Sequence, residues 1–257
     1  MSRWTRTFIL VASTTLPLMA ADHLLTADEK PAAPPAAPAT QPAADLNTLT
    51  EAEKAAGWKL LFDGKTTTGW RGYKKDKVPD AWQVIDGALV RVKKGGDLIT
   101  IDQYQSFDLI LDWRISKAGN SGVIYHATED DVSAAHTAPE CQILDNVDGE
   151  DPQRAGWCYA LYQPPDDPKT GKPLDTTKPI GQWNTLRILV DGNHVEHWMN
   201  GVKYVEYELG SDDWNARVAK SKFAKWPHWG KAKKGYIALQ DHNGEVAFRN
   251  IKIRVIP

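Results

Sequence analysis

Residues 107–116, FDLILDWRIS, alternate between apolar and polar side chains along most of their length, and this pattern constrains the fold more than any other. The apolar set is Phe107, Leu109, Leu111, Trp113 and Ile115, and the opposite set is Asp108, Ile110, Asp112 and Arg114. A repeat of two residues is typical of a β-strand, because successive side chains of a strand point to opposite faces. We therefore expect a strand with one face on a hydrophobic core and the other carrying polar groups.

Turn signals divide most of the remaining chain into short strands. A hairpin is predicted over 81–92 with its bend at Asp86-Gly87, three strands over 183–209 with turns at Asp191-Gly192 and Asn200-Gly201, and another pair over 235–256 around Asn243-Gly244. Residues 121–127 and 140–145 continue the strand pattern, and only 49–58 and 211–224 have helical features. This arrangement predicts an all-β sandwich or jelly roll with a few short helices.

The first residues have the layout of a secretory signal peptide. Arg3 and Arg6 precede an apolar run over 8–18, which ends in the small residues Ala20 and Ala21. The run is short for a membrane span, so we expect cleavage and export to the periplasm or outside the cell, with no stable membrane insertion afterwards. The alternative is a retained signal anchor.

The next segment, residues 22–48, is rich in Ala and Pro and is expected to be a disordered linker. One domain is then predicted over 49–257. Removal of 1–21 leaves 29 basic and 33 acidic residues. This mildly acidic balance argues against nucleic acid or an anionic membrane as a partner.

Period-two alternation also predicts which polar side chains share a face. Glu140 and Gln142 lie on one face of their expected strand, and Gln240 and His242 share a face of another. Asp112 and Arg114 oppose Trp113 in the same way. We expect these sets to converge on the polar face of one sheet, where they would line a cleft.

Several motifs resemble one bacterial family. They are GWKLLFDGKTTTGWR, GNSGVIY, PECQILD, QWNTLRILVDGNHVEHWMNG and GYIALQDHNGEVAFRNIKIR, and they occur between Leu49 and Arg254. The chain is similar to the 3-keto-disaccharide hydrolase domain family, formerly a domain of unknown function. The resemblance implies a concanavalin A-like, lectin-like jelly roll, export, and action on glycosides already oxidised to a ketone at C3.

A ketone at C3 makes the hydrogen at C2 acidic, so a base can remove it while the C1 oxygen leaves. Water then adds back, and the net result is hydrolysis. Such a reaction needs a base, an acid for the leaving oxygen and donors for the enolate. Glu140 is the first candidate for the catalytic carboxylate, or for a metal ligand, and its alternative is a strand-edge ion pair with Arg114. His242 is the best candidate imidazole, and its alternative is a histidine at a hairpin turn.

Other residues are candidates for contacts with the sugar: Arg114, Asn120, Ser121, Tyr125, His126, Gln142, Asp145, Asn200, Trp226, Trp229 and Gln240. Each has a structural alternative. Asn120 and Ser121 belong to a turn, Asp145 could cap a loop, and Asn200 begins an Asn-Gly hairpin turn. The aromatic rings could stack on sugar, or they could belong to the core.

Cofactors and partners stay open at this point. Glu140, His242, His126 and Asp145 could bind Ca²⁺ or another divalent ion, but no HExxH or CxxC spacing occurs. Cys141 and Cys158 could pair in an oxidising compartment or be two small buried hydrophobes. The expected substrate is a carbohydrate, and its ketone implies a functional link to a sugar 3-dehydrogenase. The alternative function is a non-catalytic carbohydrate-binding jelly-roll module, and an inactive homologue that acts in a complex is a third.

Overall fold

The computed structural model describes residues 46–257. The predicted signal peptide (1–21) and residues 22–45 of the predicted linker lie outside the described residues. Within the described part of the chain, no helix has the length and apolar character needed to cross a membrane.

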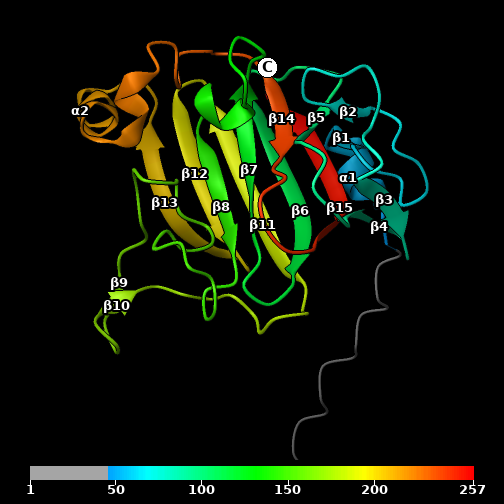
Figure 1. The fold of residues 1–257 in the computed structure, drawn as a ribbon, viewed down its shortest axis with the longest axis horizontal. Coiled ribbons are helices and arrows are strands. Elements are labelled where there is room, and N and C mark those ends of the chain that lie inside the picture. The colour runs from blue at the N-terminus through cyan, green and yellow to red at the C-terminus, as the bar shows by residue number, and fades with distance from the viewer. Residues whose placement is uncertain (1–45) are drawn as a thin grey trace, which may run out of the picture. The chain divides into compact units, whose positions relative to one another are not determined.

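Two sheets form a β-sandwich (Figure 1). In order, the larger sheet contains β13 (Val202–Glu208), β12 (His194–Met199), β11 (Asn184–Asp191), β6 (Phe107–Ile115), β15 (Val246–Val255), β4 (Ala88–Arg91) and β3 (Trp82–Ile85), and β1 (Trp58–Leu60) also pairs with β15. The smaller sheet contains β2 (Trp70–Gly72), β5 (Leu98–Thr100), β14 (Tyr236–Leu239), β7 (Asn120–Ala127) and β8 (Glu140–Leu144). A separate two-stranded ribbon joins β9 (Asp166–Asp167) to β10 (Lys172–Pro173). The predicted all-β jelly-roll sandwich is confirmed.

Strand β6 shows why the two sheets stay together. Its predicted apolar set is buried throughout, with exposed fractions between 0% for Leu111 and 5% for Ile115. These side chains pack in one large core cluster with Val123 and Ile143 from the smaller sheet. Burial of apolar surface between the sheets is therefore the main stabilising contribution to the sandwich.

Helices are few and short, as predicted. Helix α1 (Glu51–Ala55) begins with the capping box of Thr50 and Glu53, because each side chain bonds the other's backbone N–H. Helix α2 (Asp212–Lys220) has Ser211 as its N-cap. Two 3₁₀ helices, η1 (Ala134–His136) and η2 (Lys222–Lys225), complete the helices within residues 46–257.

The predicted pairing of the last two strands is wrong. β14 pairs with β5 and β7 in the smaller sheet, whereas β15 pairs with β1, β4 and β6 in the larger sheet. The segment between them, residues 240–245, therefore crosses from one sheet to the other. Asn243 forms a bridge with Asn120 in this segment, so the Asn-Gly sequence is not a hairpin turn here.

Candidate active site

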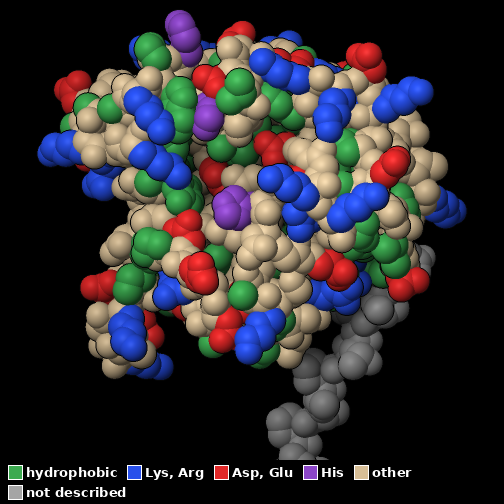
Figure 2. Space-filling view, in the orientation of Figure 1, with side chains coloured by type: hydrophobic (Ala, Val, Ile, Leu, Met, Phe, Trp, Pro, Cys, Tyr) green, Lys and Arg blue, Asp and Glu red, His purple; other side chains and the backbone are tan. Residues whose placement is uncertain are grey.

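The outer face of the smaller sheet carries a hollow of about 230 Å³. It is lined by Asp97, Asn120, Ser133, Ala135, His136, Glu140, Gln142, Asp151, Tyr159, Lys222, Phe223, Trp226, Gln240, Asp241 and His242. Two of the three sets predicted to converge, Glu140 with Gln142 and Gln240 with His242, share this hollow, whereas the third, Asp112 with Arg114, lies on β6 of the larger sheet. Figure 2 shows acidic side chains within the hollowed part of this face, with histidine and basic side chains beside them.

A larger hollow of about 530 Å³ adjoins the first. The two have five lining residues in common: Asn120, Asp151, Tyr159, Lys222 and His242. We call the combined depression the cleft. Its size suits a ligand of several sugar-sized units, because small-molecule sites commonly measure about 300–1,000 Å³.

Glu140 lies on the floor of the cleft because of its strand register. β8 pairs with β7 so that Ile124 is opposite Glu140 and Gly122 is opposite Gln142. A Cβ atom on Gly122 would lie 2.0 Å from Glu140 Oε1. Gly122 therefore leaves the space that the carboxyl group occupies, which explains one glycine of the Gly-Asn-Ser-Gly sequence.

Burial dominates the electrostatics of Glu140. Loss of solvent raises the pKa of its carboxyl group to about 8, and the nearby Asp97 adds to this effect. Lys222 and a hydrogen bond from Gln240 Nε2 to Glu140 Oε2, 3.1 Å long, act in the opposite direction. Glu140 therefore holds a proton at neutral pH and can act as an acid.

Asp97 is a cleft residue that the sequence analysis missed. It lies just before β5, and burial raises its pKa to about 6. The backbone N–H of Asp241 donates to Asp97 Oδ1 over 2.9 Å. Asp97 follows the loop sequence KKGG, where neither alternation nor a motif marks a functional residue.

A buried ion pair fixes the segment that carries His242. Arg91 Nε donates to Asp241 Oδ1 over 2.5 Å, and the backbone N–H groups of Gly95 and Gly96 donate to Asp241 Oδ2. The same guanidinium donates to the carbonyl groups of Gly244, over 2.6 Å, and His242, over 3.4 Å. The imidazole of His242 is exposed at the edge of the cleft, but its backbone carbonyl is bound by the Arg91 guanidinium.

Aromatic and basic side chains form the wall opposite the strands. Trp226 stacks on His136 with ring centroids 4.0 Å apart. Lys222 Nζ lies 4.1 Å from the ring centre of Tyr159, whose hydroxyl donates to Asp151 Oδ2 over 2.8 Å. The prediction placed Trp226 at a binding surface, and Trp226 does line the cleft.

Tyr125 and His126 do not reach the cleft. Tyr125 is fully buried between the sheets, where its hydroxyl bonds His197 Nε2 over 2.9 Å. His126 has φ of 59° beside an irregularity in the β7–β14 ladder, and its Nε2 bonds the carbonyl of Gln105 over 2.7 Å. Tyr125 obeys the alternation, because it shares the core face with Val123, whereas the local bulge breaks the alternation at His126. Neither residue faces the sugar site as predicted.

Arg114 and Ser121 are also placed elsewhere. Arg114 belongs to β6 of the larger sheet and packs 4.9 Å from the ring centre of Trp183, so neither the sugar contact nor an ion pair with Glu140 forms. Ser121 is buried and donates to the carbonyl of Gln240 over 2.8 Å. It acts as a structural link beneath the cleft.

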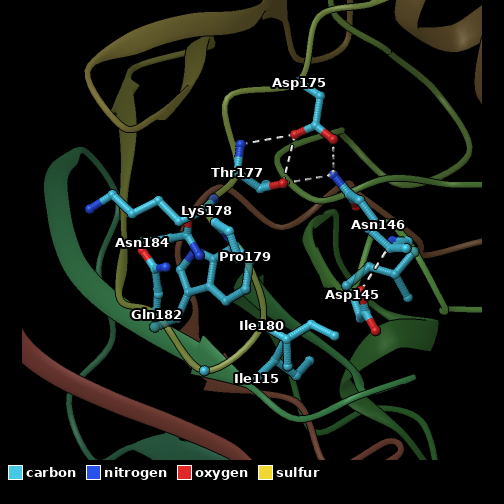
Figure 3. Close-up of a pocket in the computed structure, with 14 residues that line it drawn as sticks. Ile115, Asp145, Asn146, Asp175, Thr177, Lys178, Pro179, Ile180, Gln182 and Asn184 are labelled. Carbon is cyan, nitrogen blue, oxygen red and sulfur yellow. Dashed lines mark hydrogen bonds between the residues drawn. The ribbon is translucent and has the colours of Figure 1, made fainter.

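Three further candidates have structural roles. Asp145 caps a loop by accepting from the N–H groups of Ala118 and Val147, and it lines a separate cavity of about 470 Å³ (Figure 3). Asn200 begins the hairpin turn and bonds Thr185. Trp229 is buried against Phe223, with ring centroids 3.9 Å apart.

The four predicted metal ligands do not come together, because only Glu140 and His242 line the cleft. Among the described residues, His194, Glu196 and Glu206 do cluster within 4.8 Å on β12 and β13. Lys203 forms ion pairs with both glutamates there. The cluster is therefore an ion-pair network.

The comparisons with known proteins agree with this architecture. The model of the 3-keto-alpha-glucoside-1,2-lyase-like domain matches residues 57–254. The chain belongs to this family.

A protein named 3-keto-disaccharide hydrolase from Bacteroides thetaiotaomicron is 34% identical to this family member over 249 residues, which cover 83% of each chain. A crystal structure of a protein from Parabacteroides distasonis, described as a glycosyl hydrolase, has a TM-score of 0.76 and 35% identity. It covers 82% of this chain and 100% of that chain. A second such structure from the same organism has a TM-score of 0.56 and 27% identity, over 73% of this chain and 99% of that chain.

Proposed function

We propose that the protein is an exported enzyme that cleaves 3-keto-glycosides by elimination across C1–C2, followed by hydration. The family, the name of the Bacteroides relative and the carbohydrate-sized cleft support this proposal. The single observation that carries it is a buried acid, Glu140, with a raised pKa in the same hollow as His242. Such a pairing suits acid–base chemistry on a bound ligand.

In the proposed elimination, His242 takes the proton from C2 and Glu140 gives its proton to the departing C1 oxygen. The electron pair of the C2–H bond forms the C1–C2 double bond, and the electrons of the C1–O bond leave with the oxygen. Asp97, close to Glu140, helps keep the Glu140 proton in place, because its negative charge disfavours a second carboxylate.

Hydration reverses these roles. The Glu140 carboxylate takes a proton from water as the water oxygen attacks C1, and the protonated His242 returns a proton to C2. Both groups end in their starting states, so the cycle is balanced. The amide groups of Gln142 and Asn120 at the cleft are proposed to hold sugar hydroxyls, with the edge of the Trp226 ring as an apolar contact, since His136 and Lys225 lie over the ring itself.

The substrate also implies a partner. We propose that a sugar 3-dehydrogenase supplies the ketone and that the enzyme works after export, in the periplasm or outside the cell. The apolar segment before Ala20 supports export. A divalent ion at the cleft would be an additional component. The assay below tests for it by comparing activity with and without EDTA.

The test compares a 3-keto-disaccharide with the same disaccharide before oxidation, each incubated with purified protein in the presence and absence of EDTA. Sugar release from the keto substrate only is the expected result. Glu140→Gln should bind substrate but lower kcat by a factor of about 100 or more, the usual effect of losing a general acid. Glu51→Gln, at an exposed glutamate of helix α1 that lines neither hollow, is the matched control and should keep wild-type turnover.

Release from the unoxidised disaccharide at a similar rate would contradict the elimination mechanism, since that sugar has no acidified C2 hydrogen. Binding without release from either sugar would instead favour the alternative function, a carbohydrate-binding module.

A further inference from the structure

Cys141 and Cys158 lie directly opposite each other in the hydrophobic core. They form an isolated antiparallel bridge between β8 and the segment that follows it. Both side chains are fully buried, and both are free thiols in the structure. Neither takes part in the proposed reaction.

The backbone hydrogen bonds beside this bridge define its geometry. The N–H of Gln142 donates to the carbonyl of Trp157, and the N–H of Tyr159 donates to the carbonyl of Glu140, each over 3.0 Å. These bonds flank the cysteines, so the two residues are a non-hydrogen-bonded antiparallel pair.

In such a pair the side chains point to the same face, and the Cα atoms are about 4.5 Å apart. A disulfide requires a Cα separation of about 4.4–6.8 Å. The backbone therefore already satisfies the geometric requirement.

We propose that Cys141 and Cys158 are a modification site and form an intramolecular disulfide when the chain folds in an oxidising environment. The reaction is thiol–disulfide exchange with an external disulfide, such as oxidised glutathione or a disulfide-donating protein. One sulfur–sulfur bond forms in the protein and one breaks in the donor. Two electrons and two thiol protons pass to the donor, which leaves as two thiols.

The exchange belongs to folding. Burial raises the pKa of the Cys141 thiol well above its usual value, so little reactive thiolate exists once the core has closed. Before the core closes, both thiols are accessible. An oxidised chain would then retain a bond that is inaccessible to reductants in the folded state.

The disulfide would connect the floor of the cleft to one of its walls. β8 carries Glu140 and Gln142, and the segment on the other side of the bridge carries Asp151 and Tyr159. A covalent link between β8 and this segment would limit how far they separate when this part of the protein unfolds locally.

The test starts from protein unfolded and reduced in urea, which is refolded in a mixture of reduced and oxidised glutathione. Trypsin cuts after Arg154, between the two cysteines, so the disulfide would join peptides 118–154 and 155–169. Mass spectrometry without reductant should detect this linked pair, and a reductant should separate it. Thiol titration of the denatured product should find no free thiol.

Thermal unfolding gives a second readout. The oxidised protein should have a Tm about 5–10 °C above that of the protein refolded with reductant only. Cys141→Ala and Cys158→Ala are the matched controls, and the Tm of each should be the same after both treatments.

Two free thiols in natively refolded protein would overturn the proposal, because refolding gives the oxidant full access to both sulfurs. Cross-links only between separate chains would overturn it as well. Neither readout involves a sugar, so this result and the test of the proposed function are independent.

Discussion

At the scale of single residues, the protonated Glu140 makes stability depend on pH. Its pKa rises from 4.5 to about 8 on folding, so the folded state binds more protons than the unfolded state between these values. The contribution of Glu140 to the free energy of unfolding is therefore fully present below about pH 4.5 and is lost as the pH rises through about 8.

We predict that Glu140→Gln removes this loss, because the amide is neutral at every pH. Relative to wild type, the variant should gain roughly 3 kcal/mol of stability between pH 5 and pH 8. Urea unfolding at several pH values measures this difference. The exposed Glu150→Gln should follow the wild-type profile, and parallel curves for wild type and Glu140→Gln would refute the prediction.

Two tryptophans in the same loop should respond differently to truncation. Trp226→Ala should raise KM about fivefold with little change in kcat, because the contact of an aromatic side chain with the sugar is worth about 1 kcal/mol. Trp229→Ala should instead lower stability by about 3–5 kcal/mol, since Trp229 is buried. Kinetics and thermal unfolding of both variants provide the check, and equal effects of the two on KM would contradict the assigned positions.

The sequence predicted individual residues well where strands are regular. Alternation placed Glu140 and Gln142 on the cleft face and Cys141 in the core, as the structure has them. It failed at His126, because a positive φ there interrupts the period of two. Tyr125 keeps the period and lies on the core face with Val123. A bulge of this kind depends on pairing with β14, which is distant in sequence.

At the scale of elements, the crossing between β14 and β15 depends on the Arg91–Asp241 pair. Arg91 ends β4, whereas Asp241 lies between the two sheets, so the pair connects parts of the fold that no hairpin joins. Sequence analysis cannot identify such a contact, since the two residues are 150 positions apart in the chain. Asp97 and Lys222 were missed because a loop before β5 brings Asp97 to the cleft and the 3₁₀ helix η2 brings Lys222, and both are distant in sequence from β8.

We predict that Arg91→Ala lowers stability by about 3–5 kcal/mol, because it leaves the buried Asp241 without its ionic partner. The double variant Arg91→Met, Asp241→Asn should recover much of this stability, since no uncompensated charge remains. It should still have a lower kcat, because the Arg91 bonds to the carbonyls of His242 and Gly244 are gone. Wild-type kcat in the double variant would show that these bonds do not position His242.

At the scale of the whole molecule, composition and turn spacing were sufficient to predict a β-sandwich. They did not indicate which strand belongs to which sheet, because an alternating strand looks the same in either. Arg114 illustrates the consequence: its face was assigned correctly as polar, but that face belongs to the larger sheet. Long-range pairing decides such questions, and a single sequence contains little information about it.

The position of β15 has a consequence for biosynthesis. This strand lies between β6 and β4 and also pairs with β1, so residues 246–255 complete the middle of a sheet whose other members are made much earlier. A nascent chain that still holds these residues inside the ribosome cannot close its larger sheet. Completion of the larger sheet must therefore follow synthesis of this segment, whereas every strand of the smaller sheet is already made by then.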